Sequence, residues 1–308
     1  MDRVNKFILL LIMVFSGFLL VYFLGNININ KKIQTASVIN SNDENYKDIF
    51  SDIDLSAKSV IIYDFTSNKK IYAYNENTPV PLASLTKIMT AMVALESYKT
   101  NSQIQIVKDA LYPKDTVDFT DNDKFLLNDM VKLMLVSSSN NAALSLSFIN
   151  GPNKKSVDHF VEKMNEKANN MGLDNTIFYN PSGLDFDVEN NLPGAIGTAR
   201  DVAQMFYDAQ NEYPDIFSYT TQRAAMFPTL DGKIITVYNT DTSIGNLPGL
   251  LASKTGYTKL AGGNLAIMFS TEGHKVGIVV LGSGKEERFS DVELLAQKTT
   301  DYIKLKYK

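Results

Sequence analysis

Three short motifs in this chain hold side chains that could carry out acyl transfer. The first is the S-x-x-K sequence from Ser84 to Lys87, a hydroxyl followed three residues later by an amine. Positions i and i+3 share one face of a helix, so the Lys87 amine can lie within hydrogen-bond reach of the Ser84 hydroxyl. The same pattern recurs from Ser67 to Lys70, but that copy falls in a predicted hairpin turn and is interpreted as accidental. Ser84 is therefore the candidate nucleophile and Lys87 its candidate base.

The second motif is S-x-N, which follows a predicted apolar helix in two overlapping registers. One register pairs Ser138 with Asn140, and the other pairs Ser139 with Asn141. A hydroxyl and an amide can relay a proton and hold a substrate amide, but serine and asparagine also cap helices. Taken alone, the motif does not choose between the two registers.

The third motif is Lys254-Thr255-Gly256, followed by Tyr257. A cation and a hydroxyl on one strand suit a substrate carboxylate, and a glycine lets a ligand approach the backbone closely. The alternative interpretation is an edge strand with a solvated lysine. The triplet occurs once in the chain, which makes it the most informative of the three motifs.

The composition restricts which other chemistry these motifs could serve. The chain has no cysteine, which excludes disulfides, thiolate metal sites and a cysteine nucleophile. It has only two histidines, His159 and His274, which we expect to be an ordinary helix residue and a turn residue. We therefore predict no metal, no cofactor and a base other than histidine. The formal net charge of −4, without a basic run, gives no indication of nucleic-acid binding.

The hydrophobic pattern predicts strands at both ends of the globular region and helices between them. The chain's 308 residues are 44% hydrophobic, enough to bury a sizeable core. Period-two patterns predict strands at 59–65, 70–74, 234–238, 253–258, 264–270 and 275–281. Spacings of three and four predict helices from residue 84 onward and at 125–136, 141–148, 155–171, 199–209 and 286–304. This order predicts an α+β fold, in which distant segments complete one antiparallel sheet and a helical lobe at about 100–230 is inserted.

The N-terminus carries an apolar run from Phe7 to Leu24 that is long enough to span a membrane. Arg3 and Lys6 precede it, and no small-x-small cleavage site follows, so we expect an uncleaved signal-anchor. The polar stretch after it indicates a flexible spacer. The expected organisation is a transmembrane segment at 1–25, a linker at 26–55 and a catalytic domain at 56–308.

The three motifs, in this order, are the signature set of penicillin-recognising serine enzymes. From about Ala57 onward the chain resembles the serine D-alanyl-D-alanine carboxypeptidases, the low-molecular-mass penicillin-binding proteins of the β-lactamase-like superfamily. The stretches that carry the resemblance run from Pro81 to Glu96, Leu135 to Ala143, Asn180 to Asp185, Thr198 to Met205 and Ser253 to Thr258. It implies a β-lactamase/transpeptidase-like fold.

The resemblance also implies a role for each matching residue. Ser84 would be the acylated nucleophile, Lys87 the general base, Ser138 the proton relay and Asn140 the contact for the substrate amide. Lys254 and Thr255 would hold the terminal carboxylate, with Gly256 beside them. The backbone N–H groups of Ser84 and Tyr257 would form the oxyanion hole, and Arg288 resembles a family arginine near the carboxylate.

A lysine base requires a large change in its pKa. An unperturbed lysine has a pKa of about 10.4, which must fall by roughly three units for a base near neutrality. Desolvation and a second cation such as Lys254 would both act in that direction.

Two residues depart from the family pattern. Ser139 replaces the usual glycine, and we expect its side chain to lie near the cleft and to alter specificity or the acylation rate. Ser182 stands where a histidine is common, and we expect its effect to be structural.

The resemblance implies a serine D,D-carboxypeptidase that removes the terminal D-alanine from peptidoglycan stem peptides. The implied partners are stem peptides ending in D-Ala-D-Ala, β-lactams as covalent inhibitors, and the cell membrane, with the catalytic domain outside the cytoplasm. Three alternatives stay open: a D,D-endopeptidase, a non-catalytic muropeptide-binding module suggested by Ser139, and a class A-like β-lactamase with Glu189 as the deacylating residue.

Overall fold

The computed structural model describes residues 49–99, 101–111, 115–148 and 151–307. Contacts divide the chain into two units, Met1–Ala36 and Ser37–Lys308. The expected membrane span at 7–24 and residues 26–48 of the expected linker lie outside the described residues. Within the ranges that are described, no helix has the length and apolarity to cross a membrane.

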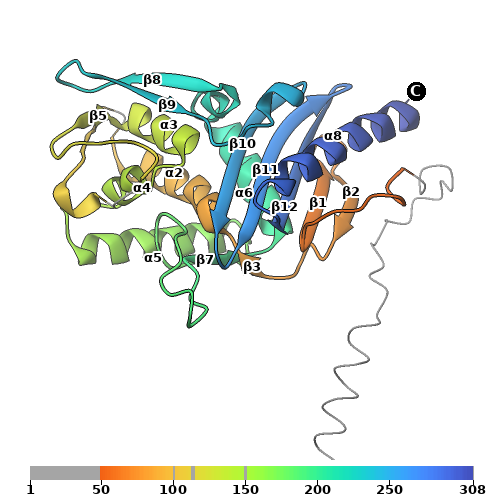
Figure 1. Cartoon of the computed structure of the whole chain (residues 1–308), viewed down its shortest axis with the longest axis horizontal. Coiled ribbons are helices and arrows are strands. Elements are labelled where there is room, and N and C mark those ends of the chain that lie inside the picture. The colour runs from red at the N-terminus through yellow and green to blue at the C-terminus, as the bar shows by residue number, and fades with distance from the viewer. Residues whose placement is uncertain (1–48, 100, 112–114, 149–150, 308) are drawn as a thin grey trace, which may run out of the picture. The chain divides into compact units, whose positions relative to one another are not determined.

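A five-stranded antiparallel sheet joins the two ends of the second unit, as the sequence predicted (Figure 1). Its order is β10-β11-β12-β1-β2. The strands are β1 (Ser59–Asp64), β2 (Lys69–Tyr74), β10 (Leu250–Thr258), β11 (Gly262–Thr271) and β12 (His274–Ser283). Strand β1 pairs with β12 with Val60 opposite Val280. The K-T-G strand, β10, therefore lies at one edge of the sheet.

Both faces of the sheet are covered, because successive side chains of a strand point to opposite faces. Ile61 and Val279 belong to the main hydrophobic core, which also holds Phe206 of helix α6 (Ala199–Glu212). The neighbouring residues face the other way, where helix α8 (Glu287–Lys306) crosses β11 and β12 (Figure 1). Leu295 of α8 is fully buried there.

The remaining helices lie between β2 and β10 in the sequence. They are α2 (Thr86–Ser97), α3 (Leu127–Ser137), α4 (Asn140–Leu146), α5 (Lys154–Asn170) and α7 (Pro214–Phe217). Short 3-10 turns are η2 (Ala83–Leu85), η3 (Lys108–Ala110), η4 (Ser218–Thr221) and η5 (Ile244–Asn246). Helix α2 is buried on all sides from Thr86 to Ala94, because it packs against α3, α4, α5 and α6. Its first turn carries Lys87 into the interior.

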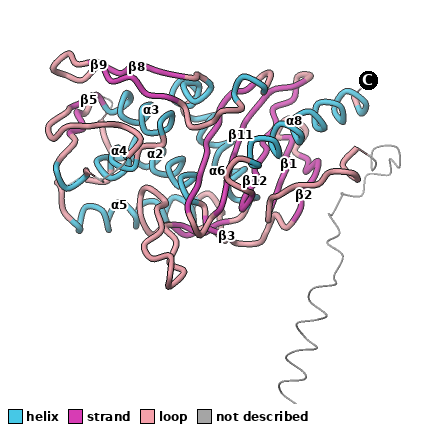
Figure 2. Tube along the Cα trace, viewed as in Figure 1, coloured by secondary structure: helices cyan, strands magenta, loops and turns pink. Residues whose placement is uncertain are grey.

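Several short strands were not predicted from the sequence. They are β3 (Val80–Pro81), β4 (Gln103–Gln105), β5 (Lys124–Leu126), β6 (Ile177–Phe178), β7 (Ala195–Gly197) and β8 (Ala224–Pro228). Most have only two or three residues, too few to show a period. Strand β8 pairs with the predicted β9 (Ile234–Tyr238) in a hairpin that contacts α3 (Figure 2). The sequence did not predict β8 because it begins with two alanines and ends with a proline, and both residue types are uncommon in strands.

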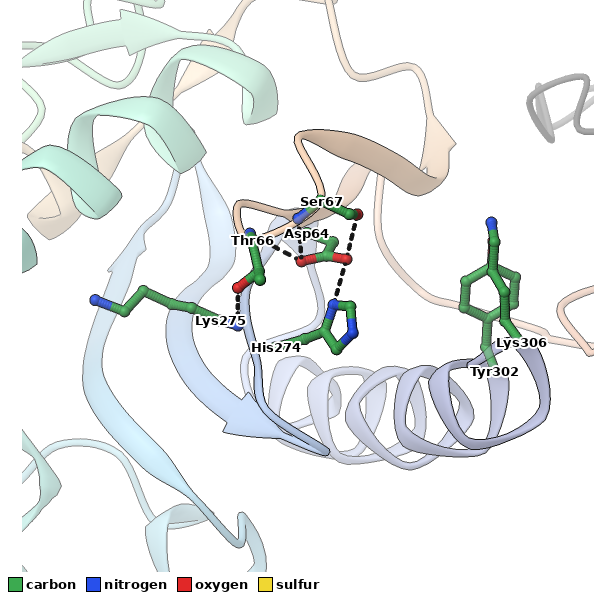
Figure 3. A network of polar contacts seen from close by, with 7 residues as sticks. All are labelled: Asp64, Thr66, Ser67, His274, Lys275, Tyr302 and Lys306. Atoms are coloured by element: carbon green, nitrogen blue, oxygen red, sulfur yellow. Dashed lines mark hydrogen bonds and ion pairs between the residues drawn. The ribbon is translucent and has the colours of Figure 1, made fainter. Parts of the chain in front are cut away.

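A buried carboxylate joins the first hairpin of the sheet to β12 (Figure 3). Asp64 ends β1 and accepts the backbone N–H groups of Thr66 and Ser67 at 3.0 and 3.2 Å. Its other oxygen lies 2.8 Å from Nδ1 of His274 and also accepts the hydroxyl of Ser67. His274, which the sequence predicted as a turn residue, is instead the first residue of β12, directly after the turn, and its partner is Asp64.

Candidate active site

Ser84 lies on the 3-10 turn η2, between strand β3 and helix α2. The sequence predicted that it would open the helix itself, but α2 begins two residues later, at Thr86. Ala83 holds a left-handed conformation with φ of 48°, which few non-glycine residues adopt. A Cβ placed on Gly256 would lie 3.1 Å from the backbone nitrogen of Ser84. The glycine therefore lets the K-T-G strand pass close to the serine turn.

Lys87 is fully buried and its amine has three close partners. Nζ lies 2.8 Å from Ser84 Oγ, from Asn140 Oδ1 and from the carbonyl oxygen of Ser182. The amide oxygen and the carbonyl can only accept, so a neutral amine donates its two hydrogens to them. Its lone pair is then free to accept the Ser84 hydroxyl proton. The geometry suits a free amine acting on a nucleophile.

Burial lowers the pKa of Lys87 to about 7, and the negative charge of Asp115 opposes this change. The sequence analysis expected Lys254 to add to the effect. The pKa of Lys254 is also lowered, first by burial and then by the positive charges of Lys87 and Arg288, and the repulsion between the two amines is mutual. Two buried amines that repel one another favour a state in which only one carries a proton.

Lys254 reaches the site from β10 and meets the S-x-N motif. Its Nζ lies 2.8 Å from Ser138 Oγ and donates to the carbonyl of Thr255 at 2.9 Å. Ser138 ends helix α3 in the left-handed conformation, with φ of 60°. Because Ser138 contacts Lys254 and Asn140 contacts Lys87, the structure brings the first of the two sequence registers to the site.

Ser139 does not lie in the cleft, so that expectation was wrong. It is completely buried and caps helix α4, where Ala142 N donates to its Oγ at 3.0 Å. The same hydroxyl donates to Asp115 at 2.5 Å. Asp115 also accepts the backbone N–H groups of Asn140 and Asn141, each at 3.0 Å. A serine at this position therefore serves to fix the start of α4, which carries Asn140.

The rest of the K-T-G strand lies beside further polar groups. Thr255 Oγ1 is 2.5 Å from Thr240 Oγ1. Arg288, at the start of α8, donates from Nη1 to the carbonyl of Gly256 at 3.1 Å and is itself buried. Tyr257 is 46% exposed. The structure thus gathers the predicted site residues of four distant segments around one edge of the sheet.

Sequence reasoning missed Asn180, which positions a Lys87 partner. Asn180 Oδ1 accepts the backbone N–H groups of Ser182 and Gly183 at 3.1 and 2.7 Å, and so orients the Ser182 carbonyl toward Lys87. The Asn-Pro-Ser-Gly sequence was a turn signal that could have indicated this. Asp115, Thr240 and Asp241 had no such signal, because each lies in a loop without a recognisable pattern.

A cavity of about 600 Å³ adjoins the site on the Ser182 side. Its walls include Ser182, Asn180, Leu144 of α4, Phe148 and Phe186. The carbonyl oxygen of Ser182 accepts a hydrogen bond from Lys87, and Leu144 lies one helical turn beyond Asn140. The cavity therefore shares Ser182 with the surroundings of Lys87, although Lys87 itself does not line it.

The described residues contain no group of three or more His, Asp or Glu side chains placed to hold a metal ion. What they do contain is a serine with a buried amine at hydrogen-bond distance, which suits covalent acyl transfer.

Comparisons with known proteins agree with this chemistry. A family profile described as D-alanyl-D-alanine carboxypeptidase matches residues 45–285. A D-alanyl-D-alanine endopeptidase of Pseudomonas aeruginosa is 31% identical over 249 residues, which cover 79% of this chain and 76% of that protein. A D-alanyl-D-alanine carboxypeptidase of Bacillus subtilis is 29% identical, over 68% of this chain and 52% of its own length.

Solved structures give the same result. The D-alanyl-D-alanine carboxypeptidase from Mycobacterium tuberculosis has a TM-score of 0.70 at 26% identity, covering 81% of this chain and 91% of that one. Penicillin-binding protein D2 from Listeria monocytogenes, in its cefotaxime-bound form, has a TM-score of 0.67 at 26% identity, covering 80% and 98%.

The cap formed by Ser139 can be tested against its neighbour. We expect Ser139→Ala to lower the free energy of unfolding by about 0.5–2 kcal/mol, because it removes the cap of α4 and a donor to Asp115. Ser138→Ala, which removes a less buried hydroxyl, should cost less. Urea unfolding of both variants measures this, and equal costs would contradict the assignment of the two serines.

The pKa of Lys87 can be measured directly. We expect the 13Cε resonance of Lys87, identified by its loss in Lys87→Met, to titrate with a midpoint of about 7, because burial disfavours the ammonium. A midpoint near the ordinary lysine value of about 10.4 would show that the amine is charged and solvated at neutral pH.

Proposed function

This chain belongs to the D-alanyl-D-alanine carboxypeptidase family of serine peptidases, and from that premise we propose that it hydrolyses peptidoglycan stem peptides ending in D-Ala-D-Ala through an acyl-enzyme on Ser84. The reaction releases the terminal D-alanine. The observation that carries the proposal is the buried Lys87 amine, 2.8 Å from Ser84 Oγ.

The first step forms the acyl-enzyme. Ser84 Oγ attacks the carbonyl carbon between the two D-alanines while the free amine of Lys87 takes the hydroxyl proton. The backbone N–H groups of Ser84 and Tyr257 are the proposed oxyanion donors, each contributing on the order of 3 kcal/mol. Gly256 supports this assignment because its close approach brings the two segments together.

The second half of the step expels the leaving group. The proton that Lys87 took from Ser84 passes to the nitrogen of the departing D-alanine, which leaves the Lys87 amine neutral again. Ser138, which is hydrogen-bonded to Lys254, is the proposed relay for this proton. Asn140 is the proposed contact for the amide of the peptide, which continues toward the cavity beside Ser182. Water then hydrolyses the acyl-enzyme, with Lys87 again acting as the base.

Recognition of the substrate's carboxylate is assigned to the K-T-G strand. Lys254 offers a buried amine and Thr255 a hydroxyl on the same strand, and Arg288 adds a second buried cation that holds the carbonyl of Gly256. A β-lactam carries a carboxylate of the same kind. We therefore expect β-lactams to acylate Ser84.

The second candidate is D,D-endopeptidase action on cross-links, because two relatives, 31% and 30% identical over 249 residues, carry that name. The geometry favours the other two alternatives less. Ser139, which suggested a non-catalytic binding module, is buried beneath α4. Glu189, the deacylating residue of a class A-like β-lactamase, is exposed, and no described hydrogen bond joins its carboxylate to Ser84 or Lys87.

The proposal is tested with a fluorescent penicillin and with purified sacculi. The full-length chain in detergent should become covalently labelled, and Ser84→Ala should not, because Ser84 is the one hydroxyl that hydrogen-bonds to Lys87 among the described residues. Mass spectrometry of digested sacculi separates the two activities: loss of one alanine from pentapeptides indicates a carboxypeptidase, and conversion of dimers to monomers an endopeptidase. A wild-type chain that neither labels nor changes the muropeptides would overturn the proposal.

We further propose that the run from Phe7 to Leu24 anchors the catalytic domain at the outer surface of the cell membrane. Its length and basic flanks support this proposal. The chain should sediment with membranes and resist extraction by high salt, and deletion of residues 1–25 should release it. A full-length chain that high salt extracts completely would contradict the anchor.

A further inference from the structure

Asp241 is a buried carboxylate that the mechanism above does not use. It follows strand β9 and is 2% exposed. Oδ1 accepts the backbone N–H and the hydroxyl of Ser243, at 2.9 and 2.6 Å. Oδ2 is buried and has no hydrogen-bond partner among the described residues. A buried carboxylate oxygen without a partner is costly unless a nearby positive charge compensates for it.

Two positive charges that interact with this carboxylate, Lys254 and Arg288, belong to the carboxylate-binding part of the site. Thr240, directly before Asp241, contacts Thr255 at 2.5 Å, which places the loop against the K-T-G strand. The charge of Asp241 stabilises the charged forms of both Lys254 and Arg288. Arg288 also has a buried Nε without a described partner. Asp241 thus lies among two buried cations and bonds to neither.

Building on the proposed function, we propose that Asp241 is a positioning residue, the internal counter-ion that keeps Lys254 in its ammonium form while Lys87 remains a free amine. The substrate's carboxylate then meets a charged Lys254, and Ser84 meets a neutral base. Arg288 and Asp241 balance one another, so these two residues and Lys254 together carry a net charge of +1, which matches a single carboxylate.

The proposal follows from the way the two lysines share protons. Only the singly protonated pair is active, and it has two arrangements, with the proton on Lys254 or on Lys87. Asp115 stabilises the charged form of Lys87, and Asp241 that of Lys254. Burial, Lys87 and Arg288 all oppose a charge on Lys254, and the charge of Asp241 favours it, together with the hydrogen bonds that Lys254 donates to Ser138 and to the Thr255 carbonyl.

The test is the pH dependence of acylation by a fluorescent penicillin, measured with the full-length chain in detergent across the range in which lysines titrate. Asp241→Asn removes the charge and keeps an oxygen for Ser243. An opposite charge within about 4–6 Å shifts a pKa by about 1–3 units. We therefore expect the alkaline limb of the pH profile of the acylation rate to move to lower pH by at least about one unit in Asp241→Asn. At a pH above that limb, the variant should then be acylated about tenfold more slowly than the wild type. Asp241→Glu should restore the limb.

Two control variants separate this role from a structural one. Ser243→Ala removes a hydrogen bond to Asp241 but keeps the charge, so its alkaline limb should stay in place. Asp115→Asn should move only the acid limb to lower pH, because Asp115 acts on Lys87. If the Asp241→Asn variant does not fold, as judged by thermal melting, Asp241→Ser is used instead, because serine is also neutral and has a smaller side chain.

The outcomes are distinct. An alkaline limb that coincides with that of the wild type, or a rate that falls equally at every pH, overturns the role of Asp241. A wild-type chain that penicillin never labels overturns the proposed function instead.

Discussion

The site depends on keeping one lysine uncharged at a pH where free lysines are charged. Removing the Lys87 amine from water supplies most of this effect, and the pKa falls to about 7. Burial alone would leave an unsatisfied polar group, so the surrounding fold provides Asn140 Oδ1 and the Ser182 carbonyl as acceptors. Those two acceptors use the hydrogens of the neutral amine and direct its lone pair at Ser84. The same environment therefore lowers the pKa and orients the base.

Residues elsewhere in the chain fix the position of each partner of Lys87. Asp115 and Ser139 fix the start of α4 and so the position of Asn140, while Asn180 orients the Ser182 carbonyl. On the opposite side, edge strand β10 brings Lys254 to Ser138, and Gly256 allows the strand to approach the Ser84 turn. The sheet supports this arrangement, because its central strands are covered on both faces by α6 and α8.

The long elements of the fold were predictable because their periods extend over many residues. The central sheet and helices such as α5 and α6 appeared close to their predicted bounds. The two-residue and three-residue strands were not predictable, since pairing with distant segments creates them. Strand β5 illustrates the difference: Phe125 looked like the start of a helix, but it pairs with Ile104 and the helix begins at Leu127. The environment of the Ser139 side chain was likewise not predictable, because it is set by a hydrogen bond to Asp115, 24 residues away.

The sequence by itself determined the chemical types at the site, because an S-x-x-K spacing, an S-x-N pair and a single K-T-G are local patterns. It also indicated a base other than histidine, since the chain has only two, isolated histidines. Only the tertiary structure decided which S-x-N register meets the lysines, how deeply both amines are buried, and that Asp115 and Asp241 act on opposite members of the pair. These properties depend on distances between segments up to 116 residues apart. Charge interactions and desolvation depend on distance in space, which local spacing does not encode.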